Sequence, residues 1–187
     1  MLLIAAPAPA SGEWQLKPFL GADFGGKTTF IDPDLAAGNA HLTVGGNGVL
    51  LGEVVGVEAD LAHAPRFFRS DDLHLVLAGH VTTLTGNVVV ALPRRLTQYS
   101  LRPYFVGGGG IMRVYIHDSL GVLPTSRILR ALDVGGGATG FVTDRVGVDW
   151  QLRYFRSIWG VDEHRGLSFG AEQLSFWRAT MAVAFRY

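Results

Sequence analysis

The 187-residue sequence has no cysteine, few charges and no long apolar run suited to a helix. Without cysteine the chain can form no disulfide, zinc ribbon or thiolate nucleophile. Sixteen basic residues balance sixteen acidic ones, and no basic cluster exceeds two adjacent residues. A nucleic-acid partner is therefore not expected, because such proteins concentrate positive charge on one surface.

The chain is nevertheless apolar, with a mean hydropathy of +0.25 and only 17% charged residues. A transmembrane helix would need roughly 20 consecutive apolar residues. Two uncharged segments come near that length, at 35–52 and 73–93. The first contains five glycines, and the second mixes His, Thr and Asn with β-branched residues, so both are poor helices. Apolar residues are instead spread over many short segments, as in a transmembrane β-barrel.

The last thirteen residues alternate between two chemically different sets. One set is apolar or aromatic: Trp177, Ala179, Met181, Val183, Phe185 and Tyr187. The other holds the charges and hydroxyl: Phe176, Arg178, Thr180, Ala182, Ala184 and Arg186. A period of two indicates a β-strand with a dry face and a wetter face. We interpret the dry face as meeting lipid, with the final aromatic ring at the headgroup level.

Eight alternating segments of this kind predict an all-β, eight-stranded, antiparallel up-and-down transmembrane β-barrel over residues 13–187. We expect strands near 15–25, 42–51, 57–65, the later part of 73–93, 101–116, 129–142, 145–154 and 175–187. Long connections at 26–41, 66–73, 117–128 and 159–172 alternate with short turns. Residues 1–12 are expected to be a residual signal peptide or a disordered tail, because Ala8-Pro9-Ala10 fits a signal cleavage pattern.

Several stretches carry a family resemblance: Gly56–Leu61 with Phe67-Phe68, Leu101–Gly110, Asp133–Gly137, Thr143–Val148 and Arg153-Tyr154. In this order they resemble the small outer-membrane β-barrel proteins, relatives of outer-membrane protein A and protein X. The resemblance implies a bacterial outer-membrane location in a Gram-negative type of envelope. It also implies assembly partners, namely periplasmic chaperones and the barrel assembly machinery, which would read a C-terminal signal at Met181, Val183, Phe185 and Tyr187. The family signal usually ends in Phe, and Tyr187 keeps the aromatic ring.

Eight charged residues fall on the predicted inward face: Lys17, Asp23, Glu58, Asp60, Asp133, Asp149, Arg153 and Arg178. The interior of an eight-stranded barrel is only wide enough to be filled by side chains. We therefore expect these residues to pair across the lumen and seal it, since buried charges persist only when paired. The glycine runs at 107–110 and 135–137 lack the context of a phosphate loop and are expected to make room for bulky inward side chains.

No catalytic, cofactor-binding or metal site is expected. The six histidines, at 41, 63, 74, 80, 117 and 164, show no metal-ligand spacing. His80 is predicted to face lipid, which suits a histidine only near the membrane interface. An interfacial belt is expected from Trp14, Phe24, Tyr104, Tyr154, Trp159, Trp177, Phe185 and Tyr187.

The expected function is structural or interactive, carried by a monomer whose extracellular loops meet an unidentified ligand while its outer face meets outer-membrane lipid. One alternative is a soluble, lipocalin-like carrier, which would have its apolar residues inside and its charges outside. Another is an enzyme that modifies lipid A, with Ser168, His164, Glu163 and Glu172 near one loop. These four residues match no active-site motif, so the chain is not expected to be an enzyme.

Overall fold

The computed structural model describes residues 12–28, 40–68, 76–93, 96–97, 101–118, 125–160 and 174–187. Eight β-strands account for most of them. In chain order they are β1 (Glu13–Thr28), β2 (His41–Leu51), β3 (Val55–Phe68), β4 (Val76–Ala91), β5 (Leu101–Asp118), β6 (Thr125–Phe141), β7 (Val146–Gly160) and β8 (Leu174–Arg186).

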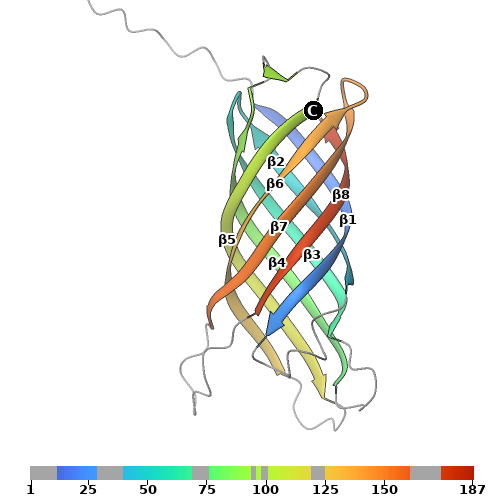
Figure 1. Ribbon diagram of the computed structural model, residues 1–187, viewed down its shortest axis with the longest axis vertical. Coiled ribbons are helices and arrows are strands. Elements are labelled where there is room, and N and C mark those ends of the chain that lie inside the picture. Colours follow the sequence, from blue (N-terminus) through green and yellow to red (C-terminus); the bar gives the residue numbers. More distant parts are fainter. Residues whose placement is uncertain are drawn as a thin grey trace, which may run out of the picture.

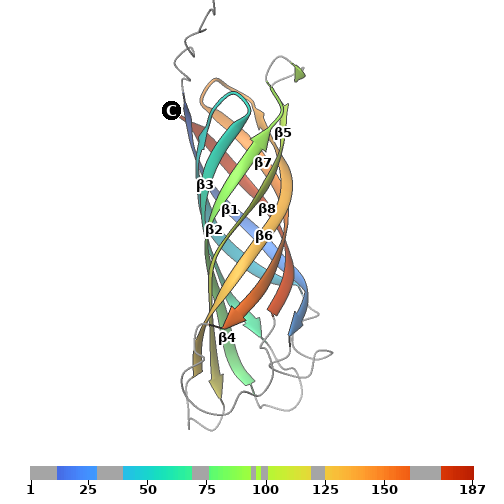
Figure 2. The ribbon, with the colours of Figure 1, turned by 90° about the vertical axis from the view of Figure 1, so that its left-hand side faces the viewer.

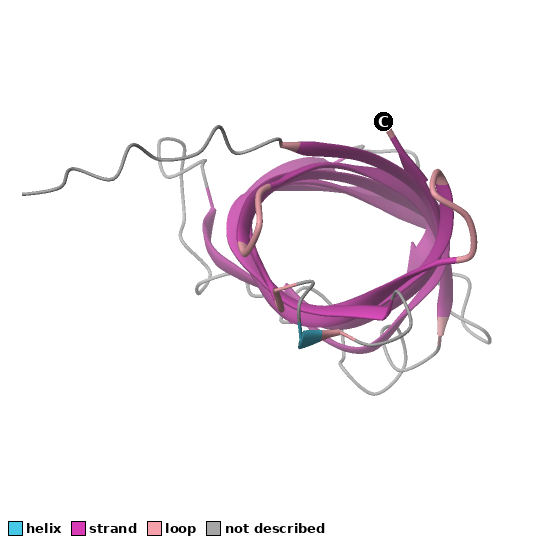
Figure 3. Ribbon diagram, turned by 90° about the horizontal axis from the view of Figure 1, so that it is seen from above, coloured by secondary structure: helices cyan, strands magenta, loops and turns pink. Residues whose placement is uncertain are grey.

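The strands form one closed barrel in sequence order, and each is antiparallel to its neighbours (Figure 1). Closure occurs where β1 pairs with β8, from Gln15 opposite Arg186 to Thr28 opposite Leu174. The view along the axis shows a complete ring of strands with no open edge (Figure 3). The expected all-β, eight-stranded antiparallel barrel is thereby confirmed.

The two ends of the barrel differ. Tight connections at Gly52–Val54 and Val142–Arg145 lie at one end, together with the C-terminus (Figures 1 and 2). We call this the turn end. The connections at 29–39, 69–75, 119–124 and 161–173 leave from the opposite, loop end and lie outside the described residues. The structure extends β5 to Asp118 and begins β6 at Thr125, so both strands run further toward the loop end than expected.

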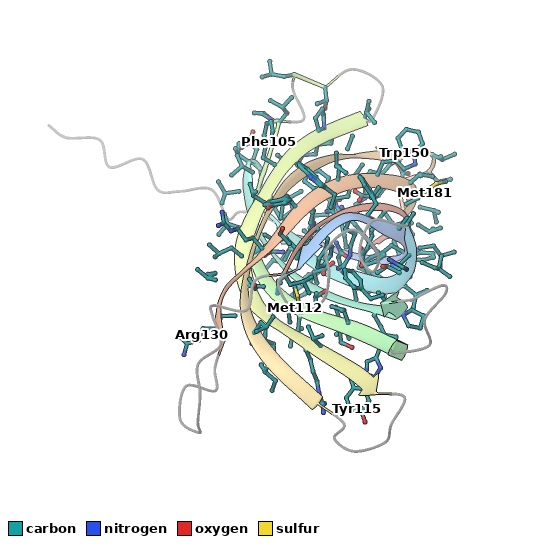
Figure 4. The ribbon with its side chains drawn as sticks, turned by 60° about the horizontal axis from the view of Figure 1, so that its bottom comes forward. Phe105, Met112, Tyr115, Arg130, Trp150 and Met181 are labelled. Atoms are coloured by element: carbon teal, nitrogen blue, oxygen red, sulfur yellow. The ribbon has the colours of Figure 1, made fainter. Side chains whose placement is uncertain are left out.

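The outer face is apolar because side chains alternate across each strand. Phe105 is 75% exposed, Val134 61% and Leu61 54%, although all three lie within strands. Figure 4 shows Phe105, Trp150 and Met181 on the outside of the wall. Exposed apolar side chains on so many strands form a far larger patch than a soluble monomer carries. Even the shortest strand, β2, has 11 residues, which is enough for a tilted transmembrane strand.

This arrangement is the reverse of a lipocalin-like carrier, whose outer face would be polar. Within the described part of the chain, no helix is long and apolar enough to cross a membrane.

Candidate functional site

The interior of the barrel holds a polar middle between two apolar layers. At the loop end, ten buried residues from six strands form one apolar cluster: Ala64, Phe67, Val81, Met112, Val114, Leu129, Ala131, Phe155, Leu174 and Phe176. Near the turn end, a second cluster contains Val49, Leu51, Val89, Ala91, Tyr104 and Val106. The charged side chains lie between these layers, where water has limited access.

Arg178 in β8 organises the part of the network nearest the loop end. Its guanidinium donates to both carboxylate oxygens of Asp23, at 2.7 and 3.2 Å, and to Thr83 Oγ1 at 2.9 Å. Asp60 Oδ1 lies 3.8 Å from the same guanidinium. The Arg178 guanidinium carbon also stands 4.6 Å from the centre of the Phe155 ring, so the charge is held against the apolar layer.

Arg153 in β7 occupies the middle of the lumen. It forms ion pairs with Glu58, on β3 across the barrel, and with Asp133 on the neighbouring strand, the latter at 3.2 Å. Asn47 and Asn87 donate to the two oxygens of Glu58, at 3.3 and 3.1 Å. A carboxylate that accepts hydrogen bonds from an arginine and two amides regains much of the free energy that its removal from water costs.

Lys17 in β1 forms the third centre, nearer the turn end. Its ammonium group donates to Asp149 at 2.8 Å and to Thr139 Oγ1 at 3.0 Å. Tyr104 OH donates to the other oxygen of Asp149 at 2.9 Å and accepts from Gln151 at 2.8 Å.

The placement of Tyr104 corrects its assignment to the interfacial belt. Its ring is only 5% exposed because the inward positions of β5 are Arg102, Tyr104 and Val106. Arg145 is exposed in the turn before β7, where Thr143 accepts from two backbone N–H groups. The side chain of Trp159 lies outside the described residues.

Arg102 narrows the mouth of the barrel at the turn end. Its side chain donates to the carbonyl oxygens of Leu92 at 3.0 Å and Glu53 at 2.5 Å. These carbonyls belong to two neighbouring turns, which the hydrogen bond from Ala91 N–H to the Val54 carbonyl also joins, so Arg102 fastens these turns to each other. This residue was missing from the predicted inward set, although it follows the same alternation as Tyr104.

Glycines on β6 make room for two of these large side chains. A Cβ on Gly137 would lie 2.7 Å from Tyr104 OH, and one on Gly135 would lie 2.8 Å from Arg153 Cγ. Distances below 3.0 Å are not found for real Cβ atoms. The glycine run thus lets Tyr104 and Arg153 lie directly against the barrel wall.

The structure places all eight predicted inward charges inside the barrel, where each is at most 4% exposed. It places Met181, Val183, Phe185 and Tyr187 on the outer face of β8 or at its end. Residues 163, 164, 168 and 172, the elements of the enzyme alternative, lie outside the described residues. His80 faces outward and stacks on Tyr115 with ring centres 4.9 Å apart.

Three arginines outside the predicted sets face outward and are exposed: Arg113, Arg130 and Arg156. Strand alternation predicts this orientation, because each arginine stands between two residues that face the lumen.

Comparison with known proteins finds matches among solved structures. Neisserial surface protein A superposes with a TM-score of 0.69 at 13% identity, over 96% of this chain and all of that one. The outer-membrane protein OprG from Pseudomonas aeruginosa gives 0.66 at 13% identity, over 95% and 97%. Ail, the attachment invasion locus protein of Yersinia pestis, in complex with the heparin analogue sucrose octasulfate, gives 0.53 at 16% identity, over 93% and 99%.

No protein-family model and no curated protein sequence matches the chain. At 13–16% identity the structural likeness establishes the fold. That fold is the small eight-stranded barrel of the outer membrane, and the apolar outer face described above is the surface it requires.

Proposed function

We propose that this outer-membrane β-barrel is a closed scaffold, which conducts no solutes and presents its extracellular connections as an interaction surface. The observation that carries the proposal is the filled interior. Three ion-paired centres, around Lys17, Arg153 and Arg178, bridge the lumen between two apolar layers. A solute would have to break buried ion pairs, among them the pair of Arg153 on β7 with Glu58 on β3, which spans the lumen.

Each centre joins strands that are not neighbours. Lys17 on β1 reaches Asp149 on β7, and Arg153 on β7 reaches Glu58 on β3. Such cross-lumen contacts fix the diameter and shape of the barrel, and they leave its side walls for lipid. With the interior occupied and the outer face apolar, the surface left for specific recognition is at the ends.

A conductance measurement tests the closed interior. We expect the refolded wild-type protein to produce no stepwise currents in planar bilayers at moderate salt. An Arg153→Ala variant removes the central cation, and the exposed Arg145→Ala variant serves as its control. Regular single-channel steps from the wild-type protein would contradict the proposal, whereas steps from Arg153→Ala alone would support the sealing role of the network.

A loop-replacement experiment tests the interaction surface. Residues 161–173 and 119–124 can be replaced, one segment at a time, by short Gly/Ser turns, because they connect the ends of adjacent antiparallel strands. The Yersinia protein was solved with a heparin analogue, which makes heparin a rational first probe. We expect heparin retention by the refolded wild-type barrel and its loss in a loop replacement that still folds. Equal retention by every replacement would argue against recognition at the loops, and no retention by the wild type would exclude sulfated polysaccharide as the ligand.

A further inference from the structure

Three exposed arginines stand on the outer face of the barrel toward the loop end. They are Arg113 in β5, Arg130 in β6 and Arg156 in β7, and we call them the arginine stripe. Side chains alternate across a strand, and the residues before and after each arginine are buried in the lumen, as Met112 and Val114 are around Arg113. Each arginine therefore points outward. Figure 4 shows Arg130 directed away from the wall.

The strand register brings the three arginines together. Arg113 pairs with Ile128 and Arg156 pairs with Leu132, so each is offset from Arg130 by two residues along β6. Diagonal neighbours in a regular ladder lie about 7–8 Å apart, within reach of long side chains, and this spacing applies to Arg113 and Arg130. The register of β6 against β7 shifts between Arg130 and Ala131, and Arg156 lies beside Leu132, two residues further along β6. The strands are inclined to the barrel axis (Figure 1). Relative to the direct partners of Arg130, Arg113 is displaced toward the loop end and Arg156 toward the turn end, and these displacements offset the inclination. The stripe therefore follows the barrel wall at a similar height and forms an arc parallel to the membrane.

No acidic side chain that the structure describes balances the stripe on the outer face. Every carboxylate whose side chain is described points into the lumen, as Asp133 does, or lies at the turn end, as Glu53, Asp144 and Glu13 do. The side chains of the three arginines make no hydrogen bond or ion pair with another described residue. At the turn end, by contrast, Arg186 lies 3.6 Å from Glu13, so charges of both signs are mixed there.

The stripe lies within the loop-side part of the apolar band, and Ile128 and Ile158 are exposed beyond it toward the loop end. Ile111 and Leu132, each two residues from an arginine of the stripe, are 44% and 53% exposed on the same outer face. On the neighbouring strands, His63 is hydrogen-bonded to Thr82 at 2.9 Å, and Thr82 is the direct partner of Arg113. Polar and apolar side chains are thus mixed at this level of the outer face, as is typical of the interface between hydrocarbon and headgroups.

We propose that the arginine stripe binds the phosphate groups of lipid in the leaflet on the loop side. The planar guanidinium group donates two parallel hydrogen bonds to a phosphate, which suits arginine to this ligand. An occupant of the site must combine acyl chains, to cover Ile111 and Leu132, with closely spaced anionic groups, to meet three arginines. A bisphosphorylated, acylated glycolipid of the lipid A type has both features.

The inference rests on the outer-membrane placement but not on the closed lumen. It is tested by reconstituting the protein in phosphatidylcholine nanodiscs that contain a small fraction of fluorescent bisphosphorylated lipid A. The measured quantity is the lipid A retained per barrel at increasing salt. A parallel sample contains the dephosphorylated glycolipid, which keeps the acyl chains and sugars. Heat-modifiability in phosphatidylcholine alone shows separately that each variant is folded and inserted.

We expect the triple variant Arg113→Gln/Arg130→Gln/Arg156→Gln to bind lipid A more weakly by on the order of a hundredfold, since one arginine near an anionic surface is worth about fivefold. The Arg113→Lys/Arg130→Lys/Arg156→Lys variant should retain an intermediate affinity, because charge is kept and the paired donors are lost. Arg145→Gln, exposed at the turn end, should bind as the wild type does.

Two results would overturn the proposal. One is unchanged retention by the folded glutamine variant. The other is that the wild-type protein retains the dephosphorylated glycolipid as well as it retains bisphosphorylated lipid A. This second comparison uses the wild-type protein alone, so it does not depend on the folding of any variant. If no barrel inserts into phosphatidylcholine, the membrane placement itself fails, and this outcome is separate from a failure of phosphate recognition.

Discussion

Asp23 and Arg178 face each other across the seam that closes the barrel, and the guanidinium group holds both carboxylate oxygens. They are direct partners in the pairing of β1 with β8. The two distances are 2.7 Å and 3.2 Å, and both side chains are buried. Because the residues are 155 positions apart, this contact can form only when the first and last strands meet.

Removing one partner of this pair should destabilise the barrel strongly. Arg178→Met leaves the Asp23 carboxylate buried without its cation, and such a loss costs about 3–5 kcal/mol. The double variant Asp23→Leu/Arg178→Met removes both charges and should regain most of that stability. Urea unfolding in phosphatidylcholine vesicles, followed by tryptophan fluorescence, measures both. A single variant as stable as the wild type would show that the pair is not needed at the seam.

Tyr104→Phe should weaken the barrel without changing its shape. The lost hydroxyl donates to Asp149 and accepts from Gln151, so the substitution leaves buried polar groups less satisfied, at a cost of about 1–3 kcal/mol. Tyr187→Phe is the matched control, because the Tyr187 ring is exposed at the chain end. The same unfolding assay applies, and equal effects of the two substitutions would contradict the lumen position of Tyr104.

A methyl group added at Gly137 should disturb the wall, whereas one added at Gly86 should not. The new Cβ at 137 would clash with the backbone carbonyl oxygen of Trp150 and stand 2.7 Å from Tyr104 OH, while nothing lies within 4 Å of one at 86. We expect Gly137→Ala to lower the temperature at which the folded band disappears from a gel. Gly86→Ala should leave it unchanged or raise it slightly, because the unfolded chain loses freedom. The reverse order would refute the close approach of Tyr104 to β6.

Substituting arginine for Leu152 tests whether lipid or water surrounds the outer face of the barrel. Leu152 is an exposed outward residue of β7 within the apolar band. Leu152→Arg should cost about 2–4 kcal/mol in lipid vesicles, the range for a cation on the lipid face of a barrel. Leu96→Arg, at an exposed site in the connection of the turn end, should change stability by less than about 0.5 kcal/mol. Similar small effects at both sites would favour water around the barrel wall.

The proposed assembly signal can be separated from folding itself. Phe185→Ala/Tyr187→Ala should reduce the amount of barrel assembled in the outer membrane of cells, with little effect on refolding of the purified protein in detergent. The backbone N–H of Tyr187 donates to Trp14 at 2.9 Å, and this contact survives in the variant. Trp177→Ala, another outward aromatic on β8, is the control. Equal assembly of all three proteins would exclude a signal role for these side chains.

Strand alternation was enough to predict eight of the charged side chains that point inward, and Arg102 was the one it missed among the buried charges of the described residues. Lys17 and Arg153 were assigned to the lumen from the apolar residues on either side of them, and the structure places both there. Where glycine or proline interrupts the alternation of polar and apolar residues, the sequence gives less information about which side chains face the lumen. Tyr104 follows Pro103 and precedes the glycine run at 107–110, so its ring was placed at the interface by residue type.

The partners of the inward charges could not be predicted in this way. Lys17 has Asn47 as its direct neighbour on β2, yet its ion pair is with Asp149, 132 residues away on β7. Arg153 likewise meets Glu58 from across the lumen, 95 residues away. Nothing in a local pattern encodes such a distance, because it depends on the diameter of the ring.

The sequence by itself determined the fold class, the two faces of most strands and eight charged residues that enter the lumen, because side-chain alternation is a local property of extended backbone. Only the tertiary structure decided which of these residues meet. Closure of eight inclined strands fixes the register of every strand against its neighbours. That register sets the cross-lumen ion pairs, and it also aligns Arg113, Arg130 and Arg156 along one arc of the outer face.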